Sequence, residues 1–264
     1  MKRKYILLLV AALAAFGAYA HETVASGLSV DPASCNLGAS GVVGQAISPE
    51  CTENSAEVSL PDPSSYVDLG LSVKWAACNI GAENPWECGD YYAWGETETK
   101  MNDSGHYCAY CWGNYKFGDE NSISKYTAKD GKTTLDGKTT LDKEDDVASV
   151  KLGAPWRMPT EAECDELIEK CTWQWTELYE MQGYKVIGPN GNYIFLPAAG
   201  WNYYEKEGDT GKTSFEGIGD GKYWVCNLSD DNKYGKRLSI DKKNTPEVWA
   251  TARCIGLPVR PVFK

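Results

Sequence analysis

The sequence predicts an α+β domain of small antiparallel sheets with one main capped helix and long loops. Three observations lead to this class. A capping box, Thr160 to Glu163, opens an amphipathic helix. The turn Pro189–Asn192 (PNGN) separates two apolar segments, as in a β-hairpin. Four more strand candidates follow near the C-terminus. Because strands follow strands instead of alternating with helices, we expect antiparallel pairing.

The helix is expected to begin after Thr160, its N-cap, and to end near Cys171. Acidic residues crowd its first turns, where the helix dipole favours negative charge. One apolar stripe has helical spacing and consists of Cys164, Leu167, Ile168 and Cys171. We therefore expect this stripe to pack on a sheet while the acids face water.

The strand candidates show period-two alternation or high aromatic content. They cover residues 66–81, 89–96, 184–187, 193–198, 222–229, 235–241, 247–254 and 257–263. Residues 107–146 are expected to form a long loop, which contains the short repeat DGKTTLDGKTTLD. The acidic run Asp142–Asp146 lacks the spacing of a calcium-binding hand. We expect a solvated acidic turn there and leave a bound calcium ion open.

The chain begins with an expected export signal. Residues 1–20 carry three positive charges, an apolar run and an Ala18-Tyr19-Ala20 cleavage site, which is typical of a secretory signal peptide. Residues 21–65 are rich in Ser, Ala, Gly and Pro and are expected to form an extended leader. The folded domain is expected at 66–264, with no integral membrane segment after cleavage. We expect the protein in the periplasm, at the cell surface or in the medium.

The charge of the chain disfavours two classes of partner. Without the signal peptide, 23 basic residues face 37 acidic ones, a net charge of −14. Such a protein without a visible basic patch is not expected to bind nucleic acid or an anionic membrane surface.

Ten cysteines in an exported chain predict disulfide bonds. The spacing leaves the pairing open, but we expect Cys35–Cys51, Cys78–Cys171 and Cys226–Cys254. Cys108 and Cys111 have the spacing of a redox motif, yet a turn-rich segment follows them where a helix is required, so a structural disulfide is favoured. With only two histidines, a three-histidine zinc site or a histidine-based triad is disfavoured. We expect no cofactor and no metal.

A series of sequence blocks resembles a known family. In order, the chain contains YVDLGLSVKWAACNIGA, GDYYAWGE, DGKTTLDKEDD, WRMPTEAECDELI, IFLPAAGW, YW and GLPVRPV. This series is similar to the Fibrobacter succinogenes major paralogous domain family of secreted bacterial proteins, over about 66–264. The resemblance implies a C-type-lectin-like fold, shared with formylglycine-generating enzymes, whose terminal strands carry outward side chains for recognition. Cys88, Cys164 and Cys226 depart from the family pattern and suggest additional crosslinks.

The function expected from these features is non-catalytic binding of a carbohydrate or protein ligand through loops and terminal strands. Alternation in 247–254 would place Trp249, Thr251 and Arg253 on one exposed face. Aromatic residues beside polar ones favour stacking and anchoring of ligands. The expected ligand-binding residues are Trp201, Tyr203, Tyr204, Asn227, Asp230, Asp231, Asn232, Tyr234, Trp249, Thr251 and Arg253.

Two alternative functions remain open. One is an exported enzyme, either oxidase-like as in formylglycine-generating enzymes or hydrolytic. Oxidase chemistry of that kind uses a close pair of late cysteines, whereas Cys226 and Cys254 lie far apart in the sequence. The other alternative is a structural subunit of a surface appendage.

Overall fold

The computed structural model describes residues 65–100, 110–127, 136–207 and 210–264. Between 204 and 218 it describes the backbone alone. These residues all lie within one compact unit of the chain, Ser55–Lys264. The expected signal peptide, the leader and the Cys35–Cys51 pair therefore lie outside the described residues, apart from Ser65.

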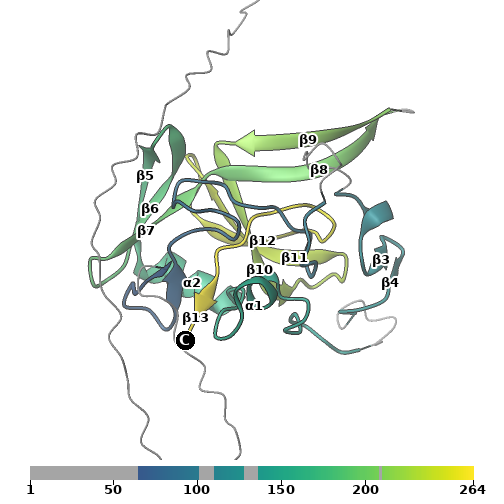
Figure 1. The fold of residues 1–264 in the computed structure, drawn as a ribbon, viewed down its shortest axis with the longest axis horizontal. Coiled ribbons are helices and arrows are strands. Elements are labelled where there is room, and N and C mark those ends of the chain that lie inside the picture. The colour runs from purple at the N-terminus through teal and green to yellow at the C-terminus, as the bar shows by residue number, and fades with distance from the viewer. Residues whose placement is uncertain (1–64, 101–109, 128–135, 208–209) are drawn as a thin grey trace, which may run out of the picture. The chain divides into compact units, whose positions relative to one another are not determined.

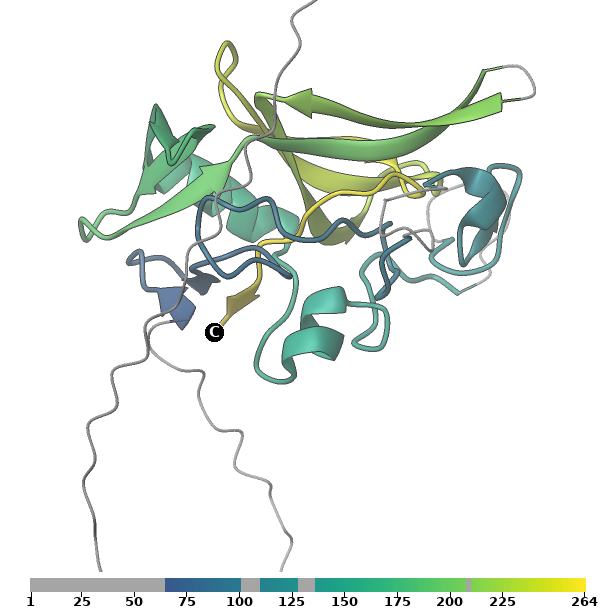
Figure 2. The same ribbon diagram turned by 45° about the horizontal axis from the view of Figure 1, so that its top comes forward.

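The largest sheet has five strands in the order β12-β11-β10-β8-β9 (Figure 1). They are β8 (Ala199–Glu207), β9 (Thr210–Ile218), β10 (Asp220–Leu228), β11 (Tyr234–Asp241) and β12 (Glu247–Ala252). Neighbouring strands are antiparallel except β8 and β10, which meet in parallel at the single pair Gly200 and Gly221. The long β8–β9 hairpin runs across the top of Figure 2. Strand β12 forms one edge of this sheet.

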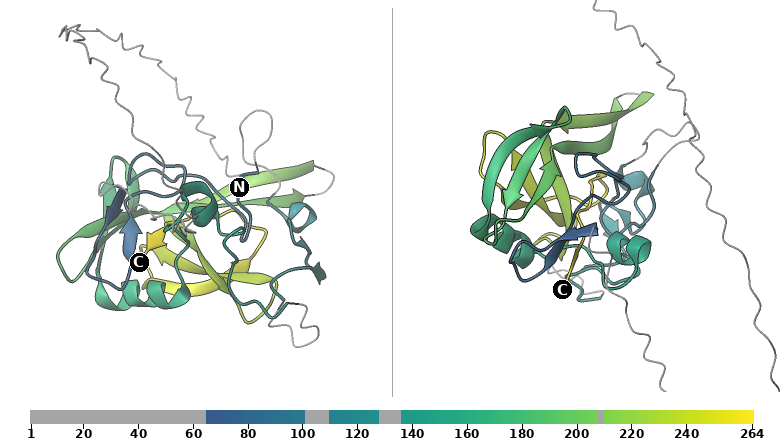
Figure 3. Two further views of the ribbon diagram at one scale, coloured as in Figure 1. Left: turned by 60° about the horizontal axis from the view of Figure 1, so that its bottom comes forward. Right: turned by 60° about the vertical axis from the view of Figure 1, so that its left-hand side comes forward.

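Two three-stranded sheets and one small hairpin complete the strands. The strands β5 (Thr172–Leu178), β6 (Met181–Ile187) and β7 (Tyr193–Pro197) form an antiparallel meander with the expected turn at 189–192. A second sheet joins β1 (Tyr66–Val67), β2 (Lys74–Ala76) and β13 (Val262–Phe263) in the order β1-β2-β13, so the last strand of the chain pairs with the second one (Figure 3). Strands β3 (Gly118–Asp119) and β4 (Ser122–Ile123) pair locally.

The main helix, α2 (Glu161–Lys170), confirms the sequence prediction. The Thr160 hydroxyl accepts from the Glu163 N–H at 3.3 Å, and the Glu163 carboxylate accepts from the Thr160 N–H at 2.8 Å. Cys164 and Leu167 are fully buried, as the apolar stripe predicted. Two shorter helices, α1 (Val147–Leu152) and the 3-10 turn η2 (Trp112–Asn114), were not expected. Small antiparallel sheets with few helices are thus confirmed.

Replacing Thr160 by Ala is expected to lower the free energy of unfolding by about 1 kcal/mol, because one N-terminal N–H of α2 loses its acceptor. Urea unfolding followed by circular dichroism measures this change. Thr160→Ser keeps the hydroxyl and is expected to retain most of the stability. A serine variant as unstable as the alanine variant would show that the hydroxyl does not stabilise the helix.

The five-stranded sheet separates two apolar clusters. Consecutive residues of β10 point to opposite faces, so Tyr223 and Val225 pack with α2 and the β5–β7 meander. Trp224 and Cys226 pack instead with the aromatic segment that contains Trp94. Both faces of the central strand β10 are therefore buried.

The expected strand at 89–96 is wrong: this segment is irregular and makes one isolated bridge, Tyr92 to Leu257. Its backbone bonds go to different loops, with the Trp94 N–H donating to the Arg253 carbonyl at 2.8 Å. The Trp94 indole N–H donates across the core to the Val225 carbonyl at 2.8 Å. The aromatic residues therefore act as core anchors and not as members of a sheet.

The disulfide predictions within the described residues are wrong. Cysteines 78, 88, 111, 164, 171, 226 and 254 are all free thiols. Cys171 packs against the cluster beside α2, whereas Cys78 lines a separate cavity next to Trp156. Burial raises the pKa of Cys226 and of Cys254 to about 12, so both stay protonated at neutral pH. Within the described part of the chain, packing and hydrogen bonds hold the fold together.

Candidate ligand-binding surface

Arg253 was expected on the exposed face, but it is fully buried. Strand β12 ends at Ala252, one residue before Arg253. The alternation of the strand therefore does not determine where the Arg253 side chain points. Its guanidinium donates to the Tyr115 hydroxyl at 2.8 Å, and to the backbone carbonyls of Asn232 at 2.9 Å and Lys125 at 3.0 Å. The surrounding rings belong to Trp94, Tyr115, Phe117 and Tyr126. Arg253 is a structural anchor.

Two predicted asparagines also hold the scaffold. Asn232 is buried, and its carbonyl accepts the bond from Arg253. The Asn227 side-chain oxygen accepts from the Glu161 N–H at 2.8 Å, at the first residue of α2. Burial closes Asn232 to a ligand, whereas Asn227 is half-buried and bonded to the start of α2.

The turn between β10 and β11 carries three further predicted residues. The Asp231 carboxylate accepts from the Lys233 N–H at 2.9 Å, which stabilises the turn, and Asp230 is exposed beside it. Tyr234 is 38% exposed and lies opposite Ala252, on the face of β11 that carries Lys236. Tyr234 therefore does not share a face with Trp249.

Trp249 and Thr251 lie on one face of the edge strand β12, as the alternation predicted. Trp249 is directly opposite Arg237 of β11, and Thr251 is opposite Gly235. The Trp249 side chain is 54% exposed, whereas Val248, on the other face, packs against the cluster beside α2. The edge of the main sheet therefore presents a large aromatic ring to solvent.

Arg237, which sequence reasoning missed, adjoins this ring. It shares a face with Trp249, because directly opposite residues of paired strands point the same way. Its Nη1 donates to the Ser239 hydroxyl, but its buried Nε has no hydrogen-bond partner in the described protein. Burial lowers the pKa of this guanidinium. The alternation of residues 235–241 could have placed Arg237 and Ser239 together.

The residues on this face form what we call the Trp249 surface: Arg237, Ser239, Glu247, Trp249 and Thr251. Glu247 lies opposite Ser239 and is exposed. It lies beyond 4.0 Å of the Arg237 nitrogens, so the two make no ion pair, although its charge partly offsets the burial effect on Arg237. The surface combines one exposed ring with several polar groups.

The predicted residues Trp201, Tyr203 and Tyr204 belong to β8, a strand that the sequence did not indicate. Trp201 is half-buried, and the Lys222 ammonium lies over its ring. Tyr203 is also half-buried, and the side chain of Tyr204 lies outside the description. We therefore centre the candidate site on Trp249.

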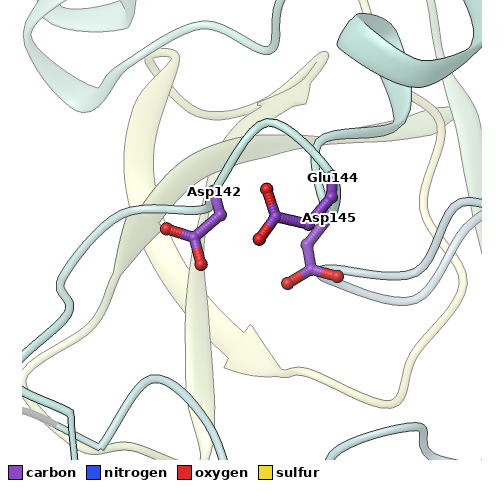
Figure 4. A group of neighbouring side chains, drawn as sticks. All are labelled: Asp142, Glu144 and Asp145. Carbon is purple, nitrogen blue, oxygen red and sulfur yellow. The ribbon is translucent and has the colours of Figure 1, made fainter.

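The acidic run at 142–146 is neutralised by lysines. The carboxylate oxygens of Asp142, Glu144 and Asp145 lie within 4.8 Å of one another (Figure 4). The Lys125 ammonium lies 2.7 Å from Asp142 and 2.5 Å from Asp145, where a metal ion would otherwise balance the charge. Hydrogen bonds from Lys125 and Lys138 lower the pKa of Asp142 to about 2.

The expectation that this whole run is solvated is wrong, because Asp145 and Asp146 are buried. Asp145 accepts from the Tyr126 hydroxyl at 2.6 Å. Asp146 is the N-cap of α1 and accepts from the Ser149 N–H at 3.0 Å and from the Met158 N–H at 2.9 Å. These bonds explain the burial and give both side chains structural roles.

A cavity of about 590 Å³ contains the titratable groups that an enzyme could use. Asp146, Arg157 and Cys226 line it, and burial raises the pKa of Asp146. Both oxygens of Asp146 already accept backbone bonds, and Arg157 is paired with the Glu163 carboxylate. The Asp146 and Arg157 side chains that line the cavity are therefore engaged in structural bonds.

Among the described residues, no helix combines the length and apolarity that a bilayer span needs. Comparison of the chain with protein-family models, curated proteins and solved structures finds no match.

Proposed function

We propose that this chain is an exported, non-catalytic carbohydrate-binding protein whose domain has a C-type-lectin-like fold. The sequence blocks that resemble the major paralogous domain family and the expected signal peptide support export and this fold. The observation that carries the function is Trp249, which is 54% exposed on an edge strand and surrounded by polar side chains. An exposed ring of this kind can stack on the apolar face of a sugar while neighbouring groups bond its hydroxyls.

The neighbours of Trp249 favour a sugar over a protein ligand. Stable protein interfaces bury about 800 Å² on each partner and have an aromatic or aliphatic centre. Among the described side chains, the other large exposed apolar ones are Val150, Leu152, Tyr179, Tyr193 and Tyr234, which lie elsewhere in the fold or on the opposite face of β11. A single ring flanked by Arg237, Glu247 and Thr251 suits a small polar ligand better.

Replacing Trp249 by Ala is expected to weaken binding to oligosaccharides at least about tenfold, since stacking on an exposed ring is lost. The full chain without its signal peptide is screened on a glycan array, and affinities for the hits are measured by calorimetry. Stability is expected to change little, because the side chain is exposed.

Tyr193→Ala is the matched control, because Tyr193 is also about half exposed, at 53%, but lies on β7 of another sheet. It is expected to leave sugar binding unchanged. Equal losses in the two variants, or a glycan array on which no sugar is bound, would contradict the proposed function. Cleavage of a bound glycan by the wild-type protein would favour the hydrolytic alternative.

A further inference from the structure

Arg237 differs from the other arginines in the described part of the chain. Arg253 and Arg260 are fully buried, and each makes four hydrogen bonds that involve all three guanidinium nitrogens. Arg157 binds the Glu163 carboxylate through both terminal nitrogens. Arg237 instead makes one side-chain bond, to the Ser239 hydroxyl.

The bonding of Arg237 leaves much of its guanidinium without a partner. Its Nε is buried and unbonded, and its Nη2 makes no hydrogen bond within the described protein. No carboxylate of the described residues lies within 4.0 Å of it. A partly desolvated cation without a partner destabilises a fold, so its place beside an exposed ring needs a reason other than stability.

We propose that Arg237 makes the Trp249 surface selective for acidic sugars, with the guanidinium binding the carboxylate of a uronic acid. This inference rests on the proposed function, in which the Trp249 ring stacks on the sugar. Arg237 lies directly across from that ring, on the same face of the sheet. A ligand seated on Trp249 therefore brings its substituents to the guanidinium, whose planar donors match a carboxylate.

The charges around Arg237 favour selective binding of acidic sugars over a general attraction to anions. The domain is strongly acidic, and Glu247 stands on the same face, so an anion without sugar contacts meets repulsion. The partial burial of Arg237 strengthens its hydrogen bonds to a bound carboxylate. Binding thus requires both the stacked ring and the acid group.

The test compares two variants with the same net charge. Arg237→Gln removes the guanidinium, whereas Lys236→Gln removes the next charge along β11, which faces α2 and pairs with Glu161 at 3.0 Å. Calorimetry measures binding of the full chain without its signal peptide to uronate hexamers (galacturonate, glucuronate, mannuronate and guluronate). Cellohexaose serves as the neutral probe and hexaglutamate as the charged peptide.

We expect at least one uronate hexamer to bind, and Arg237→Gln to weaken that binding at least about tenfold. Lys236→Gln is expected to change it less than about twofold, and Arg237→Gln to leave any cellohexaose binding within the same limit. Thermal unfolding distinguishes a role of Arg237 in binding from a role in stability. Arg237→Met is expected to unfold at the same or a higher temperature than the wild type, because an unpartnered buried donor is removed.

Three results would overturn this inference: no binding of any uronate, equal losses in the two charge variants, or hexaglutamate binding as tightly as the sugar. The inference can fail while the proposed function stands. If Trp249→Ala abolishes binding to neutral sugars while Arg237→Gln leaves uronate binding intact, the sugar site stands and its acid selectivity does not.

Discussion

Replacing Arg253 by Met is expected to lower the free energy of unfolding by about 3–5 kcal/mol, the range for removal of one partner from a buried charged network. The guanidinium joins the Tyr115 hydroxyl to the carbonyls of Lys125, Tyr126 and Asn232. Without it, these buried acceptors lose their donor, and the surrounding aromatic rings lose a cation. Urea unfolding monitored by tryptophan fluorescence measures the loss.

The matched control for this prediction is Arg237→Met, which makes the same chemical change at an arginine with one hydrogen bond. It is expected to be neutral or slightly stabilising. A loss below about 1 kcal/mol in Arg253→Met would contradict the role of Arg253 as an anchor of the loops 110–127 and 229–234.

Replacing Asp145 by Asn is expected to destabilise the protein by about 2–3 kcal/mol at pH 7, because hydrogen bonds to a charged acceptor are lost. The buried carboxylate binds Lys116 at 2.6 Å, Lys125 at 2.5 Å and the Tyr126 hydroxyl at 2.6 Å. Although burial alone raises its pKa, the bonds from Lys116, Lys125 and Tyr126 together hold it below the usual range.

The effect of Asp145 on stability depends on pH with a definite sign. Because its folded pKa is lowered, the stabilisation is fully present above the unfolded pKa of about 4 and is lost as pH falls through the folded value. The free energies of unfolding of the wild type and of Asp145→Asn are therefore expected to approach each other as the pH falls below about 4. Glu177→Gln, at an exposed position of β5, is the control and is expected to change stability by less than about 0.5 kcal/mol. A constant difference from pH 7 to pH 2 would contradict the ion-pair account.

Local signals in the sequence predicted the local structure well. The capping box at Thr160 and the turn at 189–192 depend on neighbouring residues, and the structure contains both. The strand candidates at 222–229, 235–241 and 247–254, which turn residues separate, were also found, and every end lies within two residues of the prediction. Only residues 262–263 of the last candidate form a strand.

Features that depend on distant contacts were not predictable. The segment 89–96 has the composition of a strand, but its bonds to Arg253 and Val225 are set by residues far along the chain. Cysteine counting predicted disulfide bonds, yet which thiols approach one another depends on packing. The candidates at 66–81 and 257–263 contain strands of only two or three residues, because the extent of their pairing depends on distant partners.

The candidate site was predicted in part. Alternation identified the exposed side of Trp249 but extended one residue too far and so included Arg253. Arg237 was not among the predicted site residues. What distinguishes it is a buried Nε without a hydrogen-bond partner, and no sequence pattern predicts that. The register of β11 against β12 brings it beside Trp249.

A crystal structure of residues 21–264, bound to the tightest oligosaccharide from the array, tests the central claim most directly. The account predicts a sugar ring stacked on Trp249, with an acid or hydroxyl group bonded to Arg237. A sugar bound away from β12, with Trp249 in contact with solvent alone, would contradict it.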